Sequence, residues 1–279
     1  MSVARKVISY ILAVVISILM ISVVLLGSIN SKLLNKDNMK KSFKESDYYY
    51  NLYAIIKEST ENEVMPSGFE ETVLDNVFTE EKVKTDVDTL IDCVYDNKKF
   101  EVSTEKIEDA LEANIQKEIQ EKNYVVTEET QENINEFKNA IIDTYKNHIS
   151  YSEDTVNQIS GYLQKIKDLV KIVLIILYVL LAVLLIILFV VYAPATGIVF
   201  LVSGLFFIVL NVYSGTAVAV NNILLFNWAF SKTMIYVLNN VLEDLWVKGI
   251  ILSIIGVGII IATEYFKAKK FVRMKKASV

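Results

Sequence analysis

The chain has 279 residues, of which 53% are hydrophobic and 22% charged, and its formal net charge is −5. This much apolar sequence predicts a membrane protein and argues against a purely soluble one, whose surface must be polar. The charge is uneven, because residues 28–167 hold 17 Lys against 29 Asp and Glu while the rest of the chain is net basic. An acidic domain is a poor partner for nucleic acid, because phosphate binding needs clustered Lys and Arg.

Cysteine and asparagine usage indicates the source of the chain. Cys93 is the single cysteine, so no intrachain disulfide can form. Residues 28–167 hold 14 Asn but no Asn-x-Ser/Thr sequence for N-glycosylation. Eukaryotic surface domains of this size usually carry disulfides or glycans. Together with 26 Lys against 2 Arg, these features favour a bacterial plasma membrane.

The first apolar run covers residues 7–26 and follows Arg5 and Lys6. Its length of about 20 residues is enough to cross a hydrocarbon core of about 30 Å. A cleaved signal peptide is the alternative, but its apolar region would be only about 7–15 residues long. We therefore expect residues 1–27 to form an uncleaved anchor with a short cytoplasmic N-terminus.

Residues 28–167 are expected to form an acidic helical domain. An early helix is expected at 47–63, and apolar residues then recur at helical spacing in four segments, 80–95, 104–121, 128–149 and 153–170. Four hydroxyl residues precede acidic runs as N-caps should: Thr79, Ser103, Thr127 and Ser152. Without a helix breaker after 153, one continuous helix is predicted from about 153 to 189, and the first helix is expected to extend past Leu34.

Residues 168–266 are expected to hold three further spans. The second span covers 172–192 and ends at a tight turn around Pro194. The third starts at Ile198 and ends near 213–218, and the fourth covers 249–266. An amphipathic segment at about 228–247 is either an interfacial helix or, as we favour, an outward extension of the fourth span.

The basic residues set the predicted orientation. The tail 267–279 carries six Lys or Arg, and the N-terminus carries Arg5 and Lys6. Both ends belong in the cytoplasm by the positive-inside rule, which requires an even number of spans. The sequence therefore predicts an all-α integral membrane protein with four transmembrane helices and a large extracytoplasmic helical domain inserted between the first two.

The sequence offers few residues for catalysis or metal binding. His148 is the only histidine, which argues against a zinc site. Neither a phosphate-binding glycine loop nor a Gly-x-Ser-x-Gly motif occurs in the sequence. We therefore expect no catalytic residue, cofactor or metal, and no enzymatic activity.

Three sets of residues remain as functional candidates. An aromatic patch could bind a partner, although a place in the core is the simpler interpretation: Tyr48, Tyr49, Tyr50 and Tyr53. Small residues on one face of the fourth span would let helices pack closely: Gly249, Ser253 and Gly256. A polar cluster could line a passage or cap a re-entrant segment, although the outer end of the third span is the simpler interpretation: Asn211, Asn221, Asn222 and Asn227.

The main hypothesis is a non-catalytic membrane protein whose outer domain binds a partner or ligand. Such a protein could be a sensor, an accessory subunit or an envelope scaffold, working in the lipid bilayer with another membrane or envelope protein or as a homo-oligomer. The alternative is a channel or transporter component that uses the Asn-rich segment after the third span. Ion-coupled carriers need ionisable groups within the membrane, and the centres of these spans have none.

Overall fold

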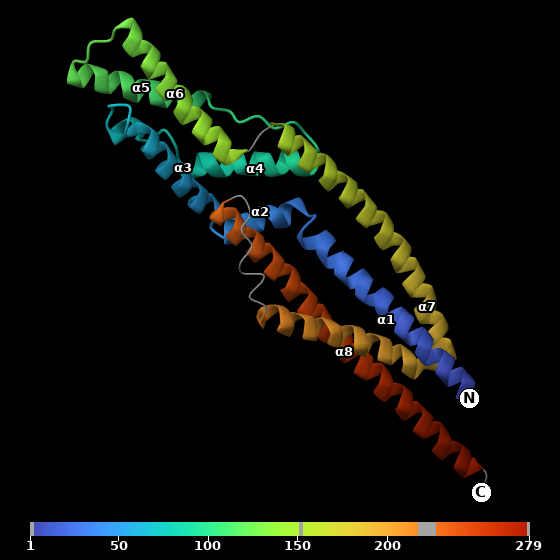
Figure 1. The fold of residues 1–279 in the computed structure, drawn as a ribbon. Coiled ribbons are helices and arrows are strands. Elements are labelled where there is room, and N and C mark those ends of the chain that lie inside the picture. Colours follow the sequence, from blue (N-terminus) through green and yellow to red (C-terminus); the bar gives the residue numbers. More distant parts are fainter. Residues whose placement is uncertain (1–2, 151–152, 217–226, 278–279) are drawn as a thin grey trace. The chain divides into compact units, whose positions relative to one another are not determined.

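A computed structural model describes residues 3–150, 153–216 and 227–277 (Figure 1). The chain divides into two compact units. The apolar unit comprises Met1–Asn35, Lys167–Ile223 and Ile235–Val279, and the polar unit comprises Lys36–Ile166 and Leu224–Met234. The polar unit thus includes a short segment that lies far along the chain from the rest of it.

All regular elements within the described ranges are helices. In chain order they are α1 (Val3–Lys32), α2 (Lys36–Glu45), α3 (Tyr48–Val64), the short 3-10 helix η1 (Glu71–Leu74), α4 (Glu80–Asp96), α5 (Glu105–Lys122), α6 (Glu128–Ile149), α7 (Glu153–Thr216) and α8 (Trp228–Ala277). The five helices expected in the outer domain, at 47–63 and in the four amphipathic segments, correspond to α3 to α6 and the start of α7.

The N-caps in the structure agree only in part with those predicted from the sequence. The side chains of Thr79 and Thr127 accept hydrogen bonds from the backbone N–H groups of Lys82 and Thr130, as expected. The expectation for Ser103 is wrong, because α5 begins after Thr104, whose hydroxyl donates to the Glu108 carboxylate instead of capping the backbone. Ser152 lies outside the described residues.

The end of the first helix also differs from expectation. Helix α1 ends at Lys32 and does not continue past Leu34. The backbone N–H groups of Leu33 and Leu34 both donate to the Ile29 carbonyl, at 2.9 and 3.0 Å, which closes the last turn. The sequence did not predict α2 either, because only three of its ten residues are buried, too few to form a recognisable stripe.

The polar unit is built around α3. This helix packs against α4 and α6, α2 packs against α3 and α4, and η1 lies against α5 and α3. The first residues of α8 complete the unit, because the ring of Phe230 lies 6.2 Å from Phe43 and 6.3 Å from Tyr48, centroid to centroid. The hydroxyls of Thr233 and Ser46 are 2.7 Å apart.

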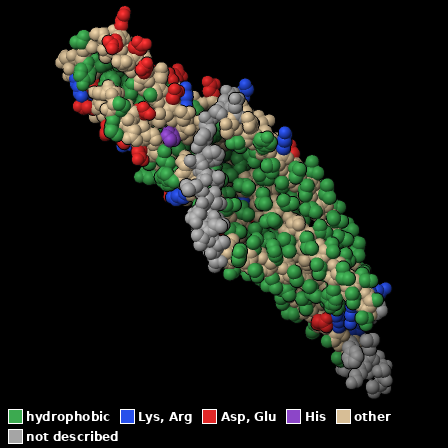
Figure 2. All heavy atoms as spheres, in the orientation of Figure 1, with side chains coloured by type: hydrophobic (Ala, Val, Ile, Leu, Met, Phe, Trp, Pro, Cys, Tyr) green, Lys and Arg blue, Asp and Glu red, His purple; other side chains and the backbone are tan. Residues whose placement is uncertain are grey.

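The apolar unit contains the candidate membrane spans. In the part of the chain that the structure describes, three helices are long and apolar enough to cross a bilayer, within Val3–Lys32, Thr155–Ser214 and Trp228–Lys270. Hydrophobic side chains cover the visible face of this unit, whereas carboxylates gather on the polar unit (Figure 2). Such an apolar exterior is what lipid contact requires and water disfavours.

Helix α7 consists of two helical parts joined at Tyr192. The backbone of Tyr192 is not helical, with φ −157° and ψ 84°, and the chain reverses there (Figure 1). The turn was expected across residues 193–197, but these residues are helical. Pro194 is tolerated because the first turn of a helix leaves its N–H groups without intrahelical partners. From Glu153 to the kink α7 is continuous, as the sequence predicts.

Helix α8 is continuous from Trp228 to Ala277. The amphipathic segment at about 228–247 is therefore an extension of the last apolar helix and not a separate interfacial helix.

Candidate functional site

Small residues bring α7 and α8 into backbone contact within the apolar unit. A Cβ atom placed on Gly256 would lie 2.5 Å from the Leu201 nitrogen and 2.7 Å from the Gly197 oxygen. One placed on Gly249 would lie 2.9 Å from the Gly204 oxygen. Gly249, Ser253 and Gly256 of α8 thus face Gly197 and Gly204 of α7, two glycines that the sequence did not identify as partners.

One end of the apolar unit is marked by tyrosines and a lysine. The Tyr10 and Tyr192 hydroxyls are 3.5 Å apart, and the Lys267 Nζ lies 5.4 Å from the centre of the Tyr192 ring. The beginning of α1, the kink of α7 and the last part of α8 therefore meet at this end.

The other end of the unit is tied by a polar contact between α1 and α8. Lys248 Nζ lies 2.9 Å from the Ser28 hydroxyl and 2.6 Å from the Asp244 carboxylate. The ammonium group of Lys248 thereby neutralises Asp244. The negative charge of Asp244 is therefore compensated within the chain.

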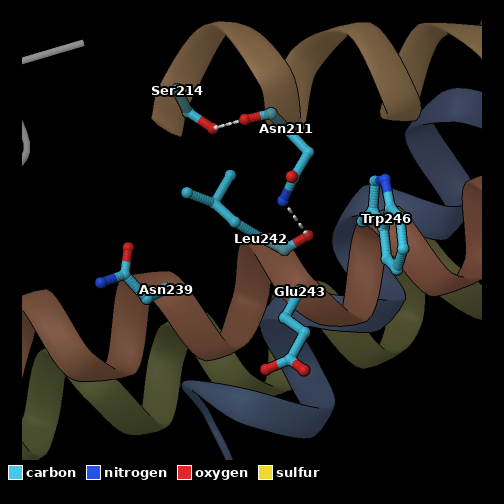
Figure 3. A pocket seen from close by; sticks show the side chains of 6 residues that line it. All are labelled: Asn211, Ser214, Asn239, Leu242, Glu243 and Trp246. Carbon is cyan, nitrogen blue, oxygen red and sulfur yellow. Dashed lines mark hydrogen bonds between the residues drawn. The ribbon is translucent and has the colours of Figure 1, made fainter. Parts of the chain in front are cut away.

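A polar pocket lies between the second part of α7 and the first part of α8 (Figure 3). It has a volume of about 410 Å³ and is lined by Asn211, Ser214, Asn239, Leu242, Glu243 and Trp246. The Asn211 side chain donates to the Leu242 carbonyl at 3.2 Å, which holds the two helices together across the pocket.

A groove of about 630 Å³ lies on the polar unit between α3 and the chain from η1 to the start of α4. Its lining includes the aromatic side chains of Tyr53 and Phe78 and the buried Thr60. Carboxylates surround it, from Glu61, Glu71, Asp75 and Glu80, against a single Lys57.

Only one of the four groove carboxylates has a cationic partner in the described part of the chain. Lys57 Nζ lies 3.6 Å from Glu61. Glu71, Asp75 and Glu80 make no ion pair with any described residue. The groove therefore carries uncompensated negative charge, which favours a cationic ligand.

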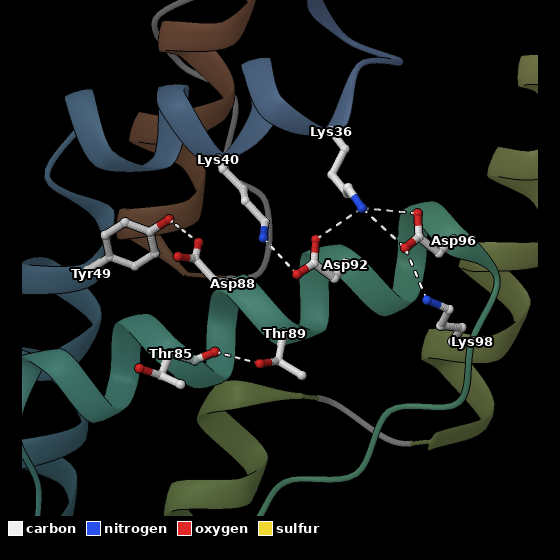
Figure 4. Close-up of polar contacts among 9 residues, drawn as sticks. All are labelled: Lys36, Lys40, Tyr49, Thr85, Asp88, Thr89, Asp92, Asp96 and Lys98. Carbon is white, nitrogen blue, oxygen red and sulfur yellow. Dashed lines mark hydrogen bonds and ion pairs between the residues drawn. The ribbon is translucent and has the colours of Figure 1, made fainter.

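Charged residues fasten α2 to α4 in the polar unit (Figure 4). Lys36 Nζ lies 3.2 Å from Asp92 and 3.1 Å from Asp96, and Lys40 Nζ lies 2.7 Å from Asp92. Burial alone would raise the pKa of Asp92, but the bonds from Lys40 and Lys36 outweigh it and lower that pKa. The hydrogen bond from Lys36 likewise lowers the pKa of Asp96. These carboxylates are committed to holding helices together.

A buried carboxylate joins α4 to α6. Asp86 is 7% exposed and accepts hydrogen bonds from Lys82 Nζ at 2.7 Å and from the Tyr145 hydroxyl at 2.6 Å. Burial and the bond to Asp86 raise the pKa of Tyr145, so its hydroxyl stays protonated and donates. Because these polar groups satisfy one another, we assign them a structural role.

The structure separates the four tyrosines of the aromatic patch. Tyr48 and Tyr49 are buried in the polar unit, and the Tyr49 hydroxyl donates to Asp88 at 2.6 Å. Tyr50 is exposed, and Tyr53 lines the acidic groove. The four do not form one surface, because adjacent residues on a helix point in different directions.

The asparagines are separated as well. Asn211 belongs to the apolar unit, whereas Asn227 belongs to the polar unit and accepts a hydrogen bond from the Phe230 backbone at the start of α8. Asn221 and Asn222 lie outside the described residues. The two described asparagines thus contact helical backbone, and a passage lined by all four stays a prediction.

His148 and Cys93 lie in the polar unit. The His148 Nε2 is 3.0 Å from the Ser59 hydroxyl, and burial lowers the pKa of the imidazole. Burial also raises the pKa of the Cys93 thiol, which disfavours the reactive thiolate. Within the described ranges no group of three or more His, Cys, Asp or Glu is placed to hold a metal ion.

Sequence reasoning missed the groove and the pocket. Several lining residues were identified in other contexts, among them Tyr53 of the aromatic patch, Thr79 as an N-cap and Asn211 of the polar cluster, but not as parts of one site. The sequence could not show that these residues lie together. Glu71 and Lys57 line the same groove only because η1 folds back onto α3. No protein-family model matches the chain, and neither a curated protein nor a solved structure is significantly similar to it.

Proposed function

We propose that the chain is a four-span bacterial plasma-membrane protein whose polar unit lies outside the cytoplasm and binds a basic segment of another membrane or envelope protein. The proposal assigns no catalysis to the chain. Binding would occur in the acidic groove of the polar unit. The observation that carries it is the set of three groove carboxylates that form no ion pair with any residue that the structure describes: Glu71, Asp75 and Glu80.

The four-span topology is supported by contacts made by the start of α8. Phe230 and Thr233 pack within the same unit as α2 and α3. The chain leaves this unit within α7 and belongs to it again at the start of α8, which supports two crossings of the bilayer by α7. The kink at Tyr192 lies between the two crossings. Tyr10, Tyr192 and Lys267 meet at one end of the apolar unit, as four antiparallel crossings require.

The orientation is supported by charge. The N-terminal Arg5 and Lys6 and the basic tail after Phe266 belong in the cytoplasm. The polar unit, entered after one crossing, then lies outside. Its many lysines do not oppose this orientation, because long domains translocate largely regardless of charge.

The binding role is supported by the lining of the groove. Tyr53 and Phe78 provide aromatic surface, and aromatic rings attract the flat guanidinium or the ammonium of a basic side chain. The carboxylates around them would add charge-assisted hydrogen bonds to the same cations. Because the groove holds rings and carboxylates together, one basic side chain could contact both.

A photo-crosslinking residue at the exposed Thr72 tests the proposal in intact cells. We expect a crosslinked partner peptide rich in Lys or Arg, identified by mass spectrometry. Neutralising the groove with Glu71→Gln, Asp75→Asn and Glu80→Gln should abolish the product, because the charge that attracts the partner is gone.

The matched control removes the same charge elsewhere in the polar unit. Glu129, Glu132 and Glu136 are exposed on α6 and do not line the groove. Changing all three to Gln should leave the product at position 72 unchanged. A product that survives neutralisation of the groove, or that is lost equally in both triple variants, would show that the groove does not bind the partner.

A further inference from the structure

The polar pocket of the apolar unit is formed by two helix faces. Asn239, Glu243 and Trp246 are spaced four and three residues apart, so they lie on one face of α8. Asn211 and Ser214 lie opposite on α7 (Figure 3). A volume of about 410 Å³ is enough for a small polar group such as a lipid headgroup.

Several polar groups of this pocket have no partner among the described residues. The Asn211 amide nitrogen is used by the Leu242 carbonyl, and Ser214 donates to the Asn211 backbone oxygen. The carboxylate of Glu243, the side-chain amide of Asn239 and the indole N–H of Trp246 make no hydrogen bond or ion pair with the described part of the chain. No residue that the structure describes competes with a ligand for these groups.

Among the described residues that line the pocket, Glu243 alone is charged. Its neighbour Asp244 lies on another side of α8 and is held by Lys248. The pocket therefore presents one uncompensated carboxylate beside an aromatic ring, with amide groups around them. A carboxylate and an indole face together favour an ammonium group, and free N–H donors favour an anion next to it.

The surroundings of the pocket are apolar and exposed. On α7, Val209 is 65% and Val212 63% exposed, and on α8 Ile251 is 51% exposed. Both helices belong to candidate membrane spans, so these side chains suit contact with acyl chains. A ligand with a polar head in the pocket and an apolar body along the helices would satisfy both surfaces.

We propose that the pocket lined by Asn211, Asn239, Glu243 and Trp246 binds the headgroup of a phospholipid that carries a primary amine, namely phosphatidylethanolamine. The ammonium contacts Glu243 and the Trp246 ring. The phosphate accepts hydrogen bonds from the Asn239 amide and the Trp246 indole N–H. The inference requires α7 and α8 to lie in a bilayer and is independent of the groove and its partner.

Three related lipids fit the pocket less well. A phosphatidylcholine headgroup has no N–H to donate to Glu243. Phosphatidylglycerol has no cation, and its net negative charge is repelled by the carboxylate. Phosphatidylserine adds a second carboxylate close to Glu243, which is unfavourable for the same reason.

Tryptophan fluorescence tests the proposal, because the chain contains only two Trp. In a Trp228→Phe variant of the full chain, purified in detergent, Trp246 is the only reporter. We expect its emission to change saturably on titration with diacyl phosphatidylethanolamine. Phosphatidylcholine, phosphatidylglycerol and soluble phosphoethanolamine should each bind at least about tenfold more weakly than phosphatidylethanolamine. Glu243→Gln should weaken phosphatidylethanolamine binding by a similar factor.

Matched variants complete the test. Glu264→Gln makes the same change on α8 outside the pocket and should leave binding unchanged. The Trp246→Phe variant, which retains Trp228, should show no response. If Glu243→Gln loses helicity, Asn239→Ala replaces it and should also weaken binding. Equal responses to all lipids, equal binding of soluble phosphoethanolamine, or a titration unchanged by the pocket variants would overturn the proposal.

Discussion

Tyr49 and Tyr145 each donate their hydroxyl hydrogen to an aspartate of α4, at 2.6 Å in both cases. These bonds fix α3 and α6 to α4 and leave the aromatic rings inside the unit. The sequence predicted a core place for part of the tyrosine patch, because Tyr49 lies on an apolar helical face. It could not identify Asp86 as the partner of Tyr145, because 59 residues separate them along the chain.

His148 gives the polar unit a pH dependence of defined sign. Burial lowers its pKa from 6.5, so the unfolded chain binds a proton more readily than the folded one. Its neutral form therefore supports stability above pH 6.5, and this support is lost as the pH falls below that value. We expect the melting temperature of the purified protein to fall between pH 7.5 and pH 5.5, and to fall less in His148→Gln. The same decrease in both proteins would contradict this assignment.

At the scale of elements, the α7–α8 contact shows how much of the helix packing can be predicted from the sequence of one helix. The spacing of Gly249, Ser253 and Gly256 indicates a face suited to close packing. It does not say which helix packs there, and the partner glycines, Gly197 and Gly204, are known only from the structure. The amphipathic helices α4 to α6 were predictable because their stripes extend over several turns, whereas α2 is too short for such a stripe.

The glycine contact predicts a difference between two neighbouring positions of α8. A methyl group on Gly256 would collide with the α7 backbone, whereas one on Gly258 would meet no atom within 4 Å. Gly256→Ala should destabilise the protein by about 1–3 kcal/mol, as overpacking does. Gly258→Ala should be neutral or stabilising by up to about 1 kcal/mol, because Ala favours a helix. Thermal unfolding in detergent measures both, and equal effects would show that α7 and α8 do not pack at these glycines.

At the scale of the whole molecule, charge and hydropathy divide the chain. The acidic composition of residues 28–167 predicted a separate domain, and the structure forms the polar unit from Lys36–Ile166 and Leu224–Met234. The second segment could not be predicted from composition, because it is apolar in sequence and joins the unit through contacts such as that of Phe230 with Phe43. That segment provides the clearest support for two crossings by α7.

Cysteine labelling tests this topology most directly. Single cysteines at Ser103, Lys232 and Lys275, in a Cys93→Ser background, would be exposed to a membrane-impermeant maleimide in intact cells. Four spans predict that positions 103 and 232 are labelled and that 275 is labelled only after the cells are permeabilised. Labelling of 103 without 232 would mean that α7 crosses the bilayer only once, and labelling of 275 in intact cells would contradict a cytoplasmic C-terminus.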